Sequence, residues 1–306
     1  MGGFFMWQKV KQAICYMSII LLLPYVITVF FNGSETAVNA GIETTYVMVE
    51  HEGERIEMSI EDYCIGKLAK EITTDSETEA LKAQAVLVRT AVYKKIKETG
   101  SAVVLEDEFW TLQEMKNQWG TAGYNKNYKK LEQAWESTEG QVLLYEDELA
   151  NAPFCKLSNG NTRDGKEVLG QEYPYLKIKE CPLDIEAKEQ FQTSVLDDFD
   201  VEVTGTDSAG YVTTVRVGQE TISGEEFRNT YELPSSSFTI QKYDGKVRIA
   251  TRGVGHGLGL SQYTANEMAK EGKDYKAILN YFFEGTQFQE VADIVFNLKL
   301  QESIQE

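Results

Sequence analysis

The sequence contains little histidine and little cysteine, and these two shortages exclude several kinds of site. Its 306 residues include two histidines and four cysteines. A catalytic zinc ion usually takes three protein ligands, and no His-Glu-x-x-His motif is present. The cysteines show no Cys-x-x-Cys spacing, so a disulfide-rich scaffold is excluded and at most one bridge can form outside the N-terminal segment. We expect no metal and no cofactor, and the sequence leaves open whether Cys155 and Cys181 pair.

Basic residues are also scarce relative to acidic ones. Lys and Arg number 30 and Asp and Glu number 48, which gives a formal net charge of -18. Nucleic-acid binding depends on basic side chains that neutralise phosphates. DNA and RNA are therefore excluded as partners.

Charge is absent from one long stretch near the N-terminus. Residues 1–34 contain no acid, and residues 13–31 contain no charged side chain at all. About 20 apolar residues form a helix that can cross a bilayer. Because Lys9 and Lys11 precede this stretch, the positive-inside rule places the N-terminus in the cytoplasm. The alternative is a signal peptide cleaved after "VNA" at 38–40.

We therefore predict a single-pass anchor followed by an extracytoplasmic domain. The predicted parts are a cytoplasmic tip and transmembrane anchor at 1–34, a tether at 35–45, the folded domain at 46–300 and a tail at 301–306. This organisation predicts a cell-membrane protein that exposes its folded domain outside the cytoplasm.

Hydrophobic periodicity predicts an α+β fold, with antiparallel strands and helices in separate parts of the chain. A strand pair is expected from residue 44, followed by a helix capped by Ser59 and another that begins with a Ser76–Glu79 capping box. A further helix is predicted at about 125–137. Residues 193–250 alternate around glycine turns, so they predict antiparallel hairpins and a β-rich subdomain. Two short helices, at about 261–272 and 274–285, follow.

The stretch "RGVGHGLGLSQY", residues 252–263, has glycine at every second position around His256. Leu258 stands where a phosphate-binding GxGxxG loop needs its third glycine, so that function is excluded. A structural histidine in a tight turn and a Cys155–His256 nucleophile pair are the alternatives, although no pattern around Cys155 supports the second. We expect His256 to contact substrate, with the glycines letting the backbone approach it.

Glu71 lies at the C-terminal end of the first predicted helix. The negative end of a helix and apolar neighbours both disfavour an ionised carboxylate, so they raise its pKa. Arg89 would have the opposite effect if it reached Glu71. A carboxylic acid that stays protonated near neutrality can donate a proton to a glycosidic oxygen.

Four blocks of the sequence resemble the stage II sporulation protein D family. They begin "IEDYCIGKLAKEITTD" at 60, "LSNGNTRDGKEVLG" at 157, "ISGEEFRNTYELP" at 222 and "RGVGHGLGLSQYTANE" at 252. The resemblance implies a membrane-anchored peptidoglycan lytic transglycosylase with Glu71 as its catalytic residue. It also implies a substrate groove built or lined by Arg89, Tyr175, His256, Ser261 and Gln262.

The sequence departs from the family at two positions. Cys155 stands where relatives commonly carry histidine, so no metal or proton-transfer role is carried over to it. Thr264 replaces the small glycine that usually follows Ser-Gln-Tyr, which we interpret as a local packing difference.

The resemblance implies cleavage between N-acetylmuramic acid and N-acetylglucosamine in glycan strands already stripped of stem peptides, with a 1,6-anhydro product. It places this reaction in sporulation engulfment, beside a peptidoglycan amidase and other engulfment membrane proteins. One alternative is a non-catalytic glycan-binding module that stimulates the amidase, and another is a tethered structural protein. A hydrolase would need a second carboxylate, for which Glu226 and Asp164 are the first candidates.

Overall fold

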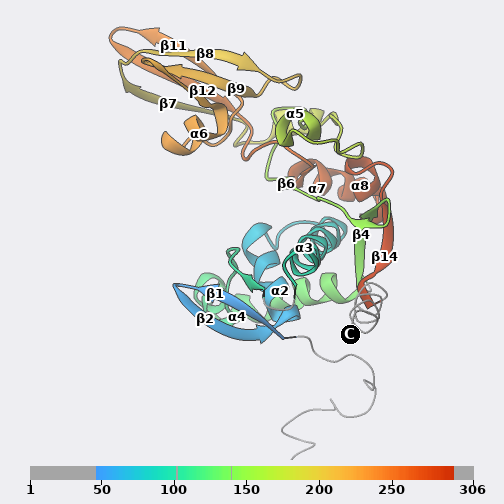
Figure 1. Cartoon of the computed structure of the whole chain (residues 1–306). Coiled ribbons are helices and arrows are strands. Elements are labelled where there is room, and N and C mark those ends of the chain that lie inside the picture. The colour runs from blue at the N-terminus through green and yellow to red at the C-terminus, as the bar shows by residue number, and fades with distance from the viewer. Residues whose placement is uncertain (1–45, 101–102, 139, 293–306) are drawn as a thin grey trace, which may run out of the picture. The chain divides into compact units, whose positions relative to one another are not determined.

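The described part of the chain begins with a β-hairpin. The computed structural model describes residues 46–100, 103–138 and 140–292. Strands β1 (Tyr46–His51) and β2 (Glu54–Ser59) are antiparallel, and β3 (Val104–Leu105) adds to β1 in parallel. The predicted strand pair is thereby confirmed, and β2 leads directly into the first helix (Figure 1).

Three helices follow the hairpin: α2 (Ile60–Glu71), α3 (Thr78–Thr99) and α4 (Leu112–Glu136). Helix α2 begins as predicted, because the Ser59 hydroxyl accepts a hydrogen bond from the Asp62 N–H at 3.0 Å. The predicted capping box of α3 is wrong. Its N-cap is Glu77, which makes no side-chain cap, and Glu79 instead accepts a hydrogen bond from the N–H of Tyr275. Helix α4 is longer than predicted, and a glycine, Gly120, breaks its geometry.

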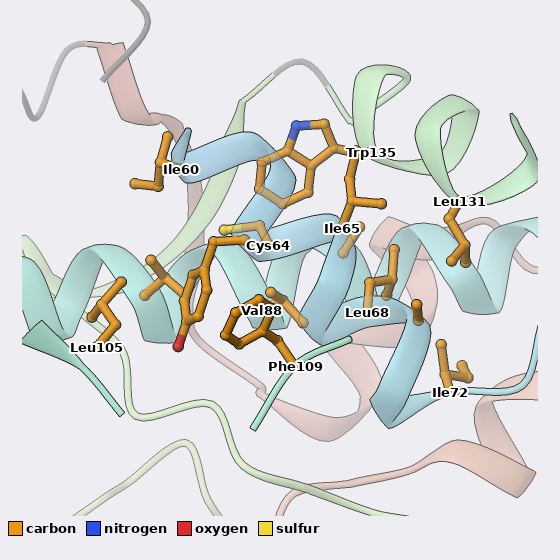
Figure 2. Packing of buried hydrophobic residues seen from close by; sticks show 14 of the residues in the cluster. Ile60, Cys64, Ile65, Leu68, Ile72, Val88, Leu105, Phe109, Leu131 and Trp135 are labelled. Carbon is orange, nitrogen blue, oxygen red and sulfur yellow. The ribbon is translucent and has the colours of Figure 1, made fainter. Parts of the chain in front are cut away.

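These helices enclose a hydrophobic core with the hairpin. Side chains of α2 at four-residue spacing, such as Cys64 and Leu68, are fully buried in it. Figure 2 shows Val88 of α3 and Leu131 and Trp135 of α4 in the same cluster. Burial of this apolar stripe fixes α2, so the position of its last residue, Glu71, is defined by packing.

A second core joins α3 to the C-terminal part of the chain. Helices α7 (Gln262–Lys270) and α8 (Tyr275–Phe282) both contact α3, and they lie beside each other in Figure 1. Ser261 and Asp274 cap them, which confirms the two predicted closing helices. The remaining elements here are β4 (Gln141–Tyr145), β5 (Glu148–Leu149), β6 (Phe154–Cys155), α5 (Gly165–Leu169), the 3₁₀ helix η1 (Pro182–Glu186), β13 (Leu260–Ser261) and β14 (Gln287–Glu290).

The stretch from 191 to 252 is rich in antiparallel strands, as the alternation of 193–250 predicts, and it contains a separate cluster of buried apolar side chains. One sheet has the order β10–β9–β8 and another the order β11–β12–β7, with helix α6 between β10 and β11 in the chain (Figure 1). Phe227, Val215 and Ile249 are among its fully buried side chains. The elements are β7 (Phe191–Asp197), β8 (Val201–Thr206), β9 (Val212–Val217), β10 (Glu220–Ser223), α6 (Gly224–Thr230), β11 (Phe238–Tyr243) and β12 (Lys246–Arg252).

The fold is α+β, with largely antiparallel sheets. The tip and anchor predicted at 1–34, the tether at 35–45 and the tail at 301–306 lie outside the described residues. Within the described residues, no helix combines the length and apolar character that a membrane crossing needs.

Candidate active site

Glu71 and His256, 185 positions apart in the sequence, line one cavity of about 570 Å³. Helix α3 forms one wall, and the stretch from Ala150 to Phe154 forms another. We call this space the His256 cavity. The two residues that the sequence suggested for chemistry therefore face the same volume.

The Glu71 carboxyl is largely enclosed, with 17% of the side chain exposed. Its Oε1 lies 3.2 Å from the Lys67 ammonium, and its Oε2 accepts a hydrogen bond from the Gln84 amide at 3.1 Å. Burial raises the pKa of Glu71 above its usual value, and this effect outweighs the lowering by Lys67 and Gln84. The predicted direction of the shift is confirmed, with burial as its main cause.

Two glutamines hold the end of α2 in place. The side chain of Gln262 donates to the backbone carbonyl of Glu71 at 3.0 Å and to the Gln84 side-chain oxygen at 3.2 Å. Gln84 is fully buried on α3, and Gln262 is the first residue of α7. Three helices thus converge on Glu71, and Gln262 acts by positioning it.

His256 is partly buried in the turn before β13. Its Nδ1 accepts a hydrogen bond from the Leu258 N–H at 3.0 Å, so the neutral ring carries its proton on Nε2. Burial lowers the pKa of His256 below its usual value, against a smaller raising effect from Glu225. His256 is therefore a neutral hydrogen-bond donor at the cavity wall.

The glycines around His256 serve close packing within the protein, which corrects the expectation that a ligand approaches them. All four have positive φ angles, between 76° and 107°. A Cβ at Gly257 would lie 2.3 Å from the Tyr211 ring, and one at Gly259 would lie 2.0 Å from the Pro153 carbonyl oxygen. The space beside this turn is filled by the chain itself, and the histidine side chain is the part that reaches the cavity.

Ser261 is buried and lines neither this cavity nor the second one described below. Its hydroxyl donates to Asp184 Oδ2 at 2.7 Å, while Thr264 donates to Asp184 Oδ1 at 2.6 Å. The backbone N–H of Ser158 completes the set of donors to this fully buried carboxylate. The threonine that departs from the family pattern is therefore part of a polar network that fixes the start of α7.

Arg89 and Tyr175 also lie away from the cavity walls. The Arg89 guanidinium is buried against the Trp135 ring, 3.7 Å from its centroid, and donates to the Trp135 carbonyl and to Thr138. It makes no contact with Glu71. Tyr175 accepts a hydrogen bond from the N–H of Asn151, a residue that does line the cavity. We predicted that Arg89 and Tyr175 contact substrate, but in the structure their polar groups are bonded to other parts of the protein and neither residue lines either of the two cavities.

A second cavity, of about 650 Å³, adjoins Glu71 as well. We call it the tryptophan cavity, because Trp110 and Trp119 line it together with Gln262 and Tyr263. Among the residues that the structure describes, Glu71 alone lines both cavities. A long ligand that passes Glu71 would therefore meet two different surfaces.

Besides Glu71, two carboxylates line the His256 cavity, and the sequence indicated neither of them: Glu98, which pairs with Lys94 at 3.3 Å, and Asp107. Asp107 Oδ2 lies 3.2 Å from the same Lys67 ammonium that contacts Glu71. Of the two carboxylates suggested from the sequence, Asp164 caps α5 and Glu226 lies in the first turn of α6, and neither lines either of the two cavities. Because Asp107 shares the Lys67 ammonium with Glu71, it is the second acid to consider in a mechanism.

Neither the cysteines nor the one metal-like cluster of the described residues belongs to these cavities. Cys64, Cys155 and Cys181 are buried free thiols, so no Cys155–Cys181 bridge is present. The side chains of His51, Glu52 and Glu114 bring ligand atoms within 4.8 Å of one another, but none of them lines either cavity.

Comparison with known proteins gives a family for this chain. The SpoIID family model, described as stage II sporulation protein, matches residues 50–145. Stage II sporulation protein D of Bacillus subtilis is 33% identical over 264 residues, which cover 78% of this chain and 76% of that protein. The chain belongs to the stage II sporulation protein D family. The protein of the same name from Bacillus amyloliquefaciens is 30% identical over 76% of this chain and 74% of its own length.

Similarity extends more distantly to the amidase enhancer of Bacillus subtilis. That protein is 27% identical over 72% of this chain and 39% of its own length. The matched family segment contains Glu71, Lys67, Gln84 and Asp107, whereas His256 lies outside it. The segment that the family model matches therefore includes the acid and its immediate surroundings.

Sequence reasoning missed Lys67, Gln84 and Asp107. For Gln84 a signal was available, since it is a polar residue between Ala83 and Ala85 on a buried helix face. Lys67 precedes Glu71 by one helical turn, which is the spacing of an i,i+4 ion pair. Nothing in the sequence around Asp107 distinguishes it from the exposed acids beside it.

Proposed function

We propose that this member of the stage II sporulation protein D family is a peptidoglycan lytic transglycosylase that acts on glycan strands during sporulation. The observation that carries the proposal is the enclosed Glu71 carboxyl, with a raised pKa, beside a cavity that His256 also lines. A protonated carboxyl is the group that must donate to the leaving oxygen of a glycosidic bond.

In the proposed reaction Glu71 acts first as an acid and then as a base. It gives its proton to the oxygen between N-acetylmuramic acid and N-acetylglucosamine as the C1–O bond breaks. The resulting carboxylate, stabilised by Lys67 and Gln84, takes the proton from the C6 hydroxyl of the muramic acid, whose oxygen bonds to C1. The products are a 1,6-anhydro end and a free hydroxyl on the other sugar, and Glu71 is protonated again.

His256 has a positioning role in this proposal. Its Nε2–H is a neutral donor suited to a sugar hydroxyl or acetamido oxygen, because burial opposes its protonation. We further propose that residues 1–34 anchor the chain in the cell membrane, with the catalytic domain outside the cytoplasm. The similarity to an amidase enhancer supports a peptidoglycan amidase and other engulfment proteins as partners.

Asp107 supports a second candidate reaction, hydrolysis with two carboxylates. A hydrolase would use Asp107 to activate water or to form a covalent intermediate while Glu71 protonates the leaving group. The end group of the product separates the two reactions, since hydrolysis leaves a reducing sugar.

The decisive experiment is to incubate the protein with glycan strands freed of stem peptides and to identify the products by mass spectrometry. We expect anhydro-muramic ends from the wild type, a rate at least about a hundredfold lower from Glu71→Gln, and measurable anhydro product from Asp107→Asn. Reducing ends, together with an inactive Asp107→Asn, would establish the hydrolase instead. Binding of strands without any product would support a glycan-binding module that stimulates an amidase.

A further inference from the structure

The tryptophan cavity contains a pair of aromatic side chains that the proposed chemistry does not use. Trp110 and Trp119 meet edge to face, with ring centroids 5.9 Å apart and an interplanar angle of 78°. Both are half-buried, so part of each ring is open to the cavity. Three further lining residues, Tyr263, Lys156 and Asn266, add an aromatic ring and polar groups.

The backbone fixes where these two rings stand. The N–H of Trp110 donates to the carbonyl of Gly66 at 3.1 Å, and a Cβ on Gly66 would lie 2.5 Å from the Trp110 oxygen. Trp110 is therefore held against α2, the helix that ends at Glu71. Trp119 directly precedes Gly120, whose φ of 66° and ψ of 166° interrupt α4. The pair is thus preorganised relative to the carboxyl.

A partly exposed aromatic pair in a cavity is suited to a flat ligand with apolar faces. The C–H bonds on the two faces of a pyranose ring make such contacts, while its hydroxyls bond to polar groups at the rim. The tryptophan cavity has aromatic faces and polar groups, and it adjoins Glu71, the residue that would protonate the bond between two sugars. A single sugar in the His256 cavity would leave this surface unused.

We propose that Trp110 and Trp119 form a stacking platform for one sugar ring of the glycan, in the cavity across Glu71 from His256. The glycan strand then occupies both cavities, with the bond to be cleaved beside Glu71. The identity of the ligand as a glycan rests on the proposed function, whereas the platform itself rests on the geometry of the tryptophan cavity.

The test measures binding in the full chain carrying Glu71→Gln, with the N-acetylglucosamine tetramer as the probe and titration calorimetry as the readout. Adding Trp119→Ala or Trp119→Leu weakens binding about three- to tenfold, because both remove the aromatic face. Trp119→Phe retains a ring and stays within about twofold of the parent. Tyr243→Ala, which removes an exposed aromatic far along the chain in β11, leaves binding unchanged.

Unchanged affinity in either Trp119→Ala or Trp119→Leu would overturn the platform. The leucine variant keeps apolar volume, so it answers the question if the alanine variant misfolds. Because binding is measured without turnover, the outcome is independent of the product assay for Glu71. If the tryptophan substitutions weaken binding but the protein releases no anhydro product, the transglycosylase proposal is refuted. The assignment of the tryptophan cavity as a glycan-binding site is retained in that case.

Discussion

At Glu71, burial and a neighbouring cation change the pKa in opposite directions. Burial raises it, Lys67 lowers it, and Asp107 raises it slightly. Lys67 lies 3.2 Å from both carboxylates, so its charge is shared between them. The protonation state of Glu71 therefore depends on how strongly the Lys67 ammonium interacts with each of the two carboxylates.

This arrangement predicts opposite pH responses from two substitutions. Asp107→Asn removes a negative charge and frees Lys67 for Glu71, so the pKa of Glu71 falls and the alkaline limb of kcat/KM moves to lower pH. Lys67→Met removes the largest lowering influence, so the limb moves to higher pH. The measurement is the pH profile of anhydro-product release.

Lys70→Met is the matched control for this pair. Lys70 contacts Glu108, an acid whose side chain is 82% exposed, so its loss should leave the limb in place. A shift of the same sign in Asp107→Asn and Lys67→Met would contradict the assignment of Glu71 as the titrating acid.

Single residues differ in how far the sequence could predict them. Glu71 could be found from its place at a helix end, because that place and its apolar neighbours are local features. The contacts of Arg89 could not be predicted, because its partners are more than 40 positions away in the sequence. Trp135 lies at the end of α4, and Thr138 lies in the turn that follows. Ser261 has the polarity of a substrate contact, but its partner, Asp184, lies 77 positions away.

At the scale of elements, the glycine turn from Gly253 to Gly259 shows why residue type alone is ambiguous. Alternating glycines indicate a backbone with positive φ angles and little room for side chains. All four glycines of this turn have positive φ angles in the structure. The sequence does not say whether a ligand or the protein fills the space, and here Tyr211 and Pro153 fill it.

Two glycine substitutions separate crowding from backbone strain. Gly259 and Gly272 have φ angles of 76° and 87°, but a Cβ at Gly272 would meet nothing within 4 Å. We expect Gly272→Ala to cost about 1 kcal/mol of unfolding free energy through strain alone, and Gly259→Ala to cost at least about 3 kcal/mol because its Cβ meets a backbone oxygen. Urea denaturation measures both, and equal losses would show that crowding is unimportant.

Helix boundaries followed local signals where no distant group competed. Ser59 caps α2 as the sequence predicts. Glu79 does not take part in a capping box, because its carboxylate accepts a hydrogen bond from the N–H of Tyr275, almost 200 positions away. The start of α4 had a usable signal, because Thr111 and Glu114 form a capping box three residues apart. The polar residues that follow weakened the apolar periodicity there.

At the scale of the whole molecule, Arg163 links the histidine turn to the β-rich part of the chain. Its guanidinium bonds to Asp207 at 2.6 Å, to Glu225 at 2.7 Å and to the backbone carbonyl of His256 at 3.2 Å. Arg163 and Asp207 are almost completely buried. The β-rich part therefore contacts the histidine turn through this cation, in addition to the Tyr211 ring that packs against Gly257.

Removing this cation leaves a buried carboxylate without its partner. We expect Arg163→Met to lower the free energy of unfolding by about 3–5 kcal/mol, and to reduce glycan cleavage by releasing the His256 turn. Arg216→Met, which loses two pairs with exposed acids, should remain close to the wild type. Chemical denaturation and product release measure the two effects, and a stable, fully active Arg163→Met would refute the linkage.

The fold class could be predicted from the sequence, but the assembly of the elements could not. The hydrophobic periodicities of strands (2 residues) and helices (3.6 residues) are local features of the sequence. The hairpins of 193–250 and the two closing helices could therefore be predicted. The two-residue strands β6 and β13 pair in parallel across more than 100 positions. Such short strands carry no periodicity, and yet this pairing places the glycine turn next to the wall of the His256 cavity.

The three buried thiols bear on how this protein reaches its folded form. Burial raises the pKa of Cys64 and Cys181 to about 12 and that of Cys155 further, so little reactive thiolate forms near neutrality. In the folded protein these three thiols consequently resist alkylating agents, and they become reactive only where local unfolding exposes them to solvent.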